Sequence, residues 1–132
     1  MDSLFRNLPI LAHILIGFYF VFYAFWNIYH WAPILKVMAQ RGIPHPYLIL
    51  PIGITLQAVA GYFIMFGIYV KISALLLIPF TIIAVFIFHP FWKHKGEARI
   101  LNFSIFLANL TITIAALILL IAPLTNVTDF LT

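Results

Sequence analysis

The sequence predicts an all-α membrane protein: one domain, residues 1–132, folded as a bundle of four transmembrane helices. A short amphipathic helix at the membrane interface is expected between the first two spans. Hydrophobic residues make up 65% of the chain and charged residues only 8%, whereas a soluble domain carries about 25% charged residues. The apolar runs do not alternate with polar residues as barrel strands do. Four uncharged gaps are each longer than the roughly 20 residues that span a hydrocarbon core: Arg6 to Lys36, Arg41 to Lys71, Lys71 to Lys93, and Arg99 to Asp129.

The first span is expected from about Pro9 to Trp31, because proline suits the first turn of a helix. Its apolar run is longer than the core of a signal peptide, and no small-x-small cleavage site follows it. We therefore expect this span to be retained. One narrow arc of the helix is small and polar, and it carries His13, Gly17, Ala24, Asn27 and Trp31.

The connection from Ala32 to Tyr47 contains a second helical pattern. Apolar side chains lie on one face and polar ones on the other, as in a helix that lies along the membrane surface. The apolar face has Ile34, Leu35 and Met38, and the polar face has Lys36 and Gln40. Gly42 suits the C-terminal cap of this helix, and the prolines that follow it at positions 44 and 46 end the helix.

The second span, about Tyr47 to Tyr69, has a small and polar face that lets a neighbouring helix approach closely. We expect the other helices to assemble on this face, which carries Gly53, Gln57, Ala60 and Gly61. The bulkier residues Ile54, Ala58, Tyr62 and Met65 lie opposite. A tight turn near Gly67 leads to the third span, about Ile72 to Trp92, so these two helices should be antiparallel neighbours.

The fourth span is expected from about Ile100 to Pro123, and it is small and polar on two faces. A helix of this kind should contact two neighbours. One face carries Asn102, Phe106, Asn109, Thr113 and Ala116, and the other carries Ser104, Ala108, Thr111 and Ala115.

The positions of the cations predict the orientation of the protein in the membrane and suggest a partner. The first and third connections hold Lys36, Arg41, Lys93, Lys95 and Arg99, while the opposite side holds Arg6 and Lys71. The excess predicts that these connections are cytoplasmic and that both termini lie outside a bacterial cytoplasmic membrane. Because the cations flank spans, the net charge of +4 indicates contact with lipid headgroups and not with nucleic acid. Lys93, Lys95 and Arg99 are also candidates to dock a soluble protein.

Five polar residues on the predicted stripes are candidates for ligand binding. If the first, second and fourth spans meet through these stripes, they form one polar interior that could hold a quinone headgroup. The alternative, which we favour, is that they form hydrogen bonds between helices, each contributing about 0.6 kcal/mol. The five residues are His13, Asn27, Gln57, Asn102 and Asn109.

The chain shows no nucleophile–base pair, phosphate-binding loop or paired carboxylates, and we expect no independent catalytic activity. It has no cysteine, which excludes thiol redox chemistry and cysteine-held clusters within this chain. Haem is not expected, because His13 and His89 should lie at opposite membrane faces. His30, His45, His89 and His94 gather on one side without metal-ligand spacing, so no metal site is predicted.

The order of these features resembles the DoxX-like family of small four-helix membrane proteins. The resemblance is carried by Gly17, Phe18 and Phe22 in the first span, Gly42, Pro44 and Pro46 in the turn, and His89 closing the third span. It is also carried by Gln57, Gly61, Gly67 and Lys71, by the stretch LNFSIFLANLTI, and by Pro123 and Asp129. The family often has glutamate at the position of Gln57 and arginine at that of Lys71.

The resemblance implies a subunit or accessory factor of a quinone-linked membrane redox system, because family members are tied to such systems. One of these is a subunit of a thiosulfate:quinone oxidoreductase. Eukaryotic relatives resemble cargo receptors and assembly chaperones, so a structural module without a ligand is the alternative. A transporter is less expected, since no carboxylate lies within the spans. Expected partners are the bilayer, an oxidoreductase subunit and further copies of this chain.

Overall fold

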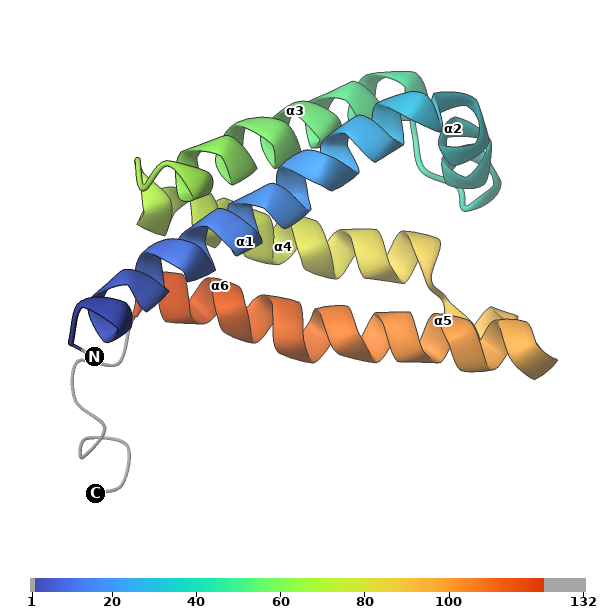
Figure 1. Ribbon diagram of the computed structural model, residues 1–132. Coiled ribbons are helices and arrows are strands. Elements are labelled where there is room, and N and C mark those ends of the chain that lie inside the picture. Colours follow the sequence, from blue (N-terminus) through green and yellow to red (C-terminus); the bar gives the residue numbers. More distant parts are fainter. Residues whose placement is uncertain (1, 123–132) are drawn as a thin grey trace.

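The computed structural model describes residues 2–122. All regular secondary structure in this range is helical (Figure 1). Four helices within this range are long and apolar enough to cross a membrane, as the sequence predicts. The first three are α1 (Asp2–Tyr29), α3 (Pro46–Met65) and α4 (Val70–Phe88). The fourth is continuous over α5 (Gly96–Ala108), the π-helix η2 (Asn109–Thr113) and α6 (Ile114–Ile121). Shorter elements are α2 (Trp31–Gln40) and the 3₁₀ turn η1 (Phe91–Lys93).

The helices pair in two layers. Figure 1 shows α1 (blue) running beside α3 (green), and α4 (yellow-green) running beside the α5–α6 helix (orange). The α3–α4 contact joins the layers, because α3 packs against both α1 and α4. The α3–α4 turn is short and uses two positive φ angles, 72° at Gly67 and 48° at Tyr69. The two helices are therefore antiparallel neighbours, as expected.

The α1–α3 contact is closest where two glycines meet. A Cβ atom on Gly17 would overlap the carbonyl oxygen of Gly61 and lie 2.5 Å from the backbone nitrogen of Met65. A Cβ atom on Gly61 would lie 2.9 Å from the carbonyl oxygen of Gly17. Gln57 and Ala60 on the same face of α3 are also buried. The small face of the second span is thus a contact surface for the first.

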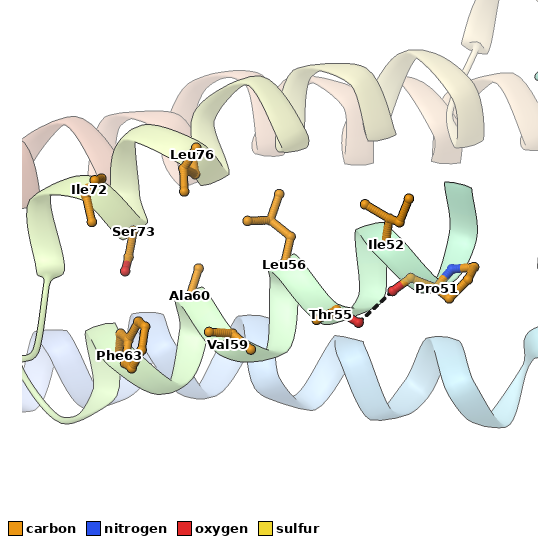
Figure 2. Close-up of a pocket in the computed structure, with 10 residues that line it drawn as sticks. All are labelled: Pro51, Ile52, Thr55, Leu56, Val59, Ala60, Phe63, Ile72, Ser73 and Leu76. Atoms are coloured by element: carbon orange, nitrogen blue, oxygen red, sulfur yellow. Dashed lines mark hydrogen bonds between the residues drawn. The ribbon is translucent and has the colours of Figure 1, made fainter. Parts of the chain in front are cut away.

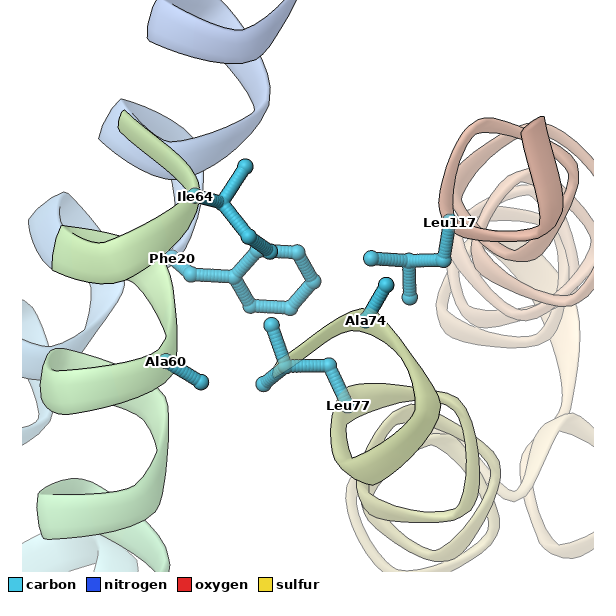
Figure 3. Close-up of a cluster of buried hydrophobic side chains, with 6 residues drawn as sticks. All are labelled: Phe20, Ala60, Ile64, Ala74, Leu77 and Leu117. Carbon is cyan, nitrogen blue, oxygen red and sulfur yellow. The ribbon is translucent and has the colours of Figure 1, made fainter. Parts of the chain in front are cut away.

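The main hydrophobic core takes side chains from all four long helices. Figure 3 shows the ring of Phe20 from α1 lying among residues of α3, α4 and α6. Ile64, Leu77 and Leu117 are fully buried beside it. The remaining members of this cluster are Ala60 and Ala74, whose small side chains let the helices come together.

A second core cluster attaches α2 to the bundle. Met38 of α2 is buried with Ala24 of α1 and with Leu50 and Ile54 of α3. The opposite face of α2, with Lys36 and Gln40, is exposed, so this amphipathic helix has the orientation that the sequence predicts. At about 100° per residue, Ile54 lies only about 20° around α3 from Gly61, so this second cluster borders the small face, and the prediction that Ile54 lies opposite that face is wrong.

The ends of α2 and α3 follow the expected turn chemistry. Gly42 has a φ of 78°, and its N–H donates to the carbonyl of Ala39 at 3.1 Å. Pro46 then begins α3, where its missing N–H costs no helical hydrogen bond. The second span ends earlier than predicted, at Met65, whereas the third runs from Val70 to Lys93, close to the predicted bounds.

The start of the first helix was predicted wrongly. The helix begins at Asp2, so Pro9 lies inside it and not in its first turn. Proline there removes one backbone hydrogen bond, but the residues before it stay helical. The carboxylate of Asp2 lies in the first turn, where a negative charge favours the helix N-terminus.

The fourth span contacts two neighbours, as predicted, because it packs against α4 and also meets α1 through Asn109 and Leu117. Its second small face is exposed along its length, and it carries Ser104, Ala108, Thr111 and Ala115. Both contacts use the side of the helix that carries Asn109 and Leu117, so the prediction that the second small face is a contact surface is wrong. Pro123 and Asp129, which belong to the resemblance, lie outside the described residues.

Candidate functional site

The five polar residues predicted to line one interior lie in separate places. Asn27 and Gln57 bond to each other, and Asn109 and Asn102 each have a different partner. His13 stays on its own helix, with its Nδ1 2.6 Å from the carbonyl oxygen of Pro9. A single shared polar interior is therefore absent from the described part of the chain.

The Asn27–Gln57 pair is a side-chain hydrogen bond between α1 and α3. The Nδ2 of Asn27 donates to the Oε1 of Gln57 at 3.0 Å. Gln57 is only 6% exposed, and Asn27 is half-buried. An amide in hydrocarbon needs such a partner, so this pair acts as a hydrogen bond between two spans.

A second polar cluster lies where α1 meets the π-helix. The hydroxyl of Tyr19 donates to the Oδ1 of Asn109 at 2.9 Å, and the Thr113 hydroxyl donates to the same oxygen at 3.4 Å. The Nδ2 of Asn109 donates to the carbonyl of Ile105 at 2.9 Å. Tyr19 remains 37% exposed. We call Tyr19, Asn109 and Thr113 the Tyr19 cluster.

The sequence reasoning missed Tyr19. Its ring lies on the aromatic face of α1, in an edge-to-face contact with Tyr23 with centroids 5.0 Å apart. It does not lie on the small stripe that was predicted to carry polar contacts. The π-helix that carries Asn109 was not predicted either. π-Helices occur as single turns within α-helices and are frequent at functional sites, but no residue type marks their position.

The third polar contact lies at the α4–α5 connection. The Nδ1 of His89 is 3.0 Å from the Oδ1 of Asn102. Because an amide oxygen only accepts, His89 carries a proton on Nδ1 in this bond. Asn102 also donates from Nδ2 to the carbonyl of Ala98. Aromatic rings, most of them in edge-to-face contact, surround this connection, and they belong to Phe86, Phe91, Trp92, Phe103 and Phe106.

The cations at this end of the bundle are open to partners. Lys93, Lys95 and Arg99 are all exposed, and no ion pair forms among residues 2–122. Their placement beside one membrane surface leaves them free for headgroups or for another protein.

The surface of the described chain has open hollows, two of which lie against the long helices. The larger, about 490 Å³, lies between α3 and α4 (Figure 2). The smaller, about 290 Å³, is lined by Phe91, Arg99, Ile100 and Phe103. None of the five predicted polar residues lines either hollow.

Comparison with known proteins then gives the family. Residues 8–90, more than half of the chain, match the DoxX family model. The chain belongs to the DoxX family. This DoxX protein is 28% identical over 114 residues to the inner membrane protein YphA of Escherichia coli (strain K12), covering 86% of this chain and 81% of YphA. No solved structure matches this chain significantly. With its family and its four long apolar helices, the protein is an integral membrane protein.

Proposed function

We propose that this DoxX protein is an accessory subunit of a quinone-linked redox system, with the Tyr19 cluster as its contact to the quinone headgroup. The observation that carries the proposal is a set of hydroxyl and amide groups within the spans that remains partly exposed. Tyr19 is 37% exposed, and Asn109 and Thr113 are half-buried. The resemblance to a redox-linked family, stated above, supplies the choice of ligand.

The chemistry of the cluster suits a quinone carbonyl. Two hydroxyls now donate to one amide oxygen, so either can turn to a carbonyl of the ligand while the other keeps the Asn109 contact. A quinone oxygen accepts such bonds as an amide oxygen does. The Asn27–Gln57 pair is a poorer candidate, because Gln57 is only 6% exposed.

The location proposed for the protein is the bacterial inner membrane. This rests on the similarity to YphA, which is an inner membrane protein. The cation excess at the α2 and α4–α5 connections supports an orientation with these in the cytoplasm and both termini outside. Cysteine accessibility on the two faces of sealed vesicles would test that orientation.

The Tyr19 hydroxyl provides the direct test. We expect the Tyr19→Phe variant to bind a short-chain ubiquinone about tenfold more weakly than the natural protein, because a lost hydrogen bond costs about 1.5 kcal/mol at the upper end of the usual range. Binding is measured by titrating the purified protein in detergent micelles and following the quench of its intrinsic fluorescence. Tyr23→Phe is the matched control, since Tyr23 is exposed to the same extent, about 40%, and lies one turn away.

Two results would contradict the quinone proposal. If the natural protein binds no quinone, or if Tyr19→Phe and Tyr23→Phe bind alike, the quinone contact at this cluster is wrong. Circular dichroism of each variant must show unchanged helix content for either comparison to count.

A structural module without a ligand is the second candidate function. It is favoured by the closed Asn27–Gln57 and His89–Asn102 pairs, which hold helices together without leaving donors for a ligand. Such a module would act by holding another membrane protein during assembly. Affinity purification from the native membrane would separate the two: an oxidoreductase subunit that copurifies supports the first candidate, and an unrelated membrane client supports the second.

A further inference from the structure

The groove between α3 and α4 is separate from the Tyr19 cluster, since neither Tyr19, Asn109 nor Thr113 lines it. Its volume of about 490 Å³ lies in the range of about 300–1,000 Å³ found for small-molecule sites. All but two of its lining residues are apolar. Figure 2 shows side chains of both helices bordering it, from Pro51 and Ile52 at one end to Phe63, Ile72 and Ser73 at the other.

The two polar residues that line the groove, Thr55 and Ser73, differ in their hydrogen bonding. The hydroxyl of Thr55 donates to the carbonyl of Pro51 at 2.8 Å, so it is satisfied by its own helix. Ser73 is only 2% exposed, and Figure 2 shows its hydroxyl pointing across the groove toward α3. No side-chain hydrogen bond found among residues 2–122 uses this hydroxyl. The hydroxyl can therefore donate to a polar atom placed at this end of the groove.

The length and position of the groove fit one leaflet of the bilayer. The helical rise from Pro51 to Phe63 is about 18 Å, and half of a hydrocarbon core is about 15 Å. Its Ser73 end lies in the first turn of α4, next to the α3–α4 turn. The groove therefore runs from one membrane surface toward the middle of the bilayer, which is the path of an acyl chain.

Charge at the same end of the groove favours a phosphate. Lys71 is exposed in the first turn of α4, and the free amides of that turn add partial positive charge. Tyr69, 70% exposed, lies beside them, where aromatic rings prefer the headgroup region. An anionic headgroup is thus favoured at the mouth of an apolar groove.

We propose that the α3–α4 groove is a binding site for one glycerophospholipid, whose acyl chain lies along α3 from Phe63 to Pro51. Its ester oxygen accepts a hydrogen bond from Ser73, and its phosphate lies near Lys71. This site holds its lipid longer than the surrounding bilayer lipid, because the acyl chain contacts two helices at once and the ester oxygen accepts a hydrogen bond from Ser73. The proposal is independent of any quinone role.

The test is photocrosslinking in the full chain. The protein is reconstituted into vesicles with a phosphatidylglycerol that carries a diazirine near the end of one acyl chain, irradiated, and digested for mapping by mass spectrometry. We expect crosslinks to gather on the peptides that line the groove. Val59→Trp should fill the groove and lower their yield at least fivefold, since Val59 is 46% exposed and lines it.

Control variants make the result decisive. Ile83→Trp adds the same ring at a 59% exposed position of α4 outside the groove, and it should leave the yield unchanged. Thr55→Phe is a second filling variant, should Val59→Trp fail to fold. Crosslinks spread evenly over all exposed helix faces, or unchanged by filling, would overturn the site. Competition by a long-chain quinone but not by unlabelled phosphatidylglycerol would overturn the choice of occupant.

Discussion

Replacing Gly17 by alanine is expected to loosen the α1–α3 pair more than any other single-methyl change in the protein. The added Cβ would overlap the Gly61 carbonyl oxygen and lie 2.5 Å from the Met65 nitrogen. Both are backbone atoms, which cannot move without shifting the helix. Overpacking usually costs about 1–3 kcal/mol, and a backbone clash should reach at least the top of that range. Unfolding by sodium dodecyl sulfate titration, followed by circular dichroism, measures this loss.

Gly53→Ala is the matched control for that change. Its added Cβ would meet only the ring edge of Phe80, at 3.4 Å, which is an ordinary contact. Because alanine favours a helix over glycine by roughly 0.5–1 kcal/mol, Gly53→Ala should leave stability unchanged or raise it. Equal losses for Gly17→Ala and Gly53→Ala would show that the Gly17–Gly61 approach does not hold these helices together.

Those features of the fold that follow from local pattern could be predicted from the sequence. The spans follow from uncharged length, and the α2 helix follows from the opposition of Met38 and Lys36. The α3 contact face follows from Gln57, Ala60 and Gly61, because helical spacing puts these small residues on one side whatever the partner is. Each of these inferences uses only residues within one helix.

Those features that depend on two helices could not be predicted. Asn109 was assigned to the correct face of the fourth span, but its partner Tyr19 lies 90 residues away and on a face defined by aromatic rings. The stripe of the first span contains both Asn27 and His13, yet only Asn27 reaches another helix. A stripe shows which side of a helix is small, and the tilt between helices decides which of its residues meet a partner.

The exposed second face of the fourth span illustrates the same limit. Small residues permit close packing but do not bring a neighbour. Thr111 shows how a hydroxyl there is satisfied without one, since it donates to the carbonyl of Leu107 on its own helix at 2.7 Å. Ser and Thr in a span are therefore weaker evidence for a contact than Asn and Gln, whose amides need more partners than one carbonyl supplies.

Removing the Asn27–Gln57 hydrogen bond is expected to have the second large effect on the stability of the protein. Gln57→Leu should lower the free energy of unfolding by about 1–3 kcal/mol, because it leaves the Asn27 amide without a partner in an apolar contact. Changing Asn27 to leucine as well should recover most of the loss, since neither helix then carries an unsatisfied group. The same detergent titration measures the single variants and the double variant as a cycle.

The size of the coupling decides what the pair does. Hydrogen bonds between membrane helices average about 0.6 kcal/mol and reach about 1.7, so a cycle in that range identifies the pair as a bond between spans. Thr55→Val is the control, because the Thr55 hydroxyl bonds only to its own helix and its loss should not couple to Asn27. If Gln57→Leu is as stable as the natural protein, or if the double variant loses the full sum of the two single losses, the bond contributes nothing. The α1–α3 contact would then depend on the glycine approach alone.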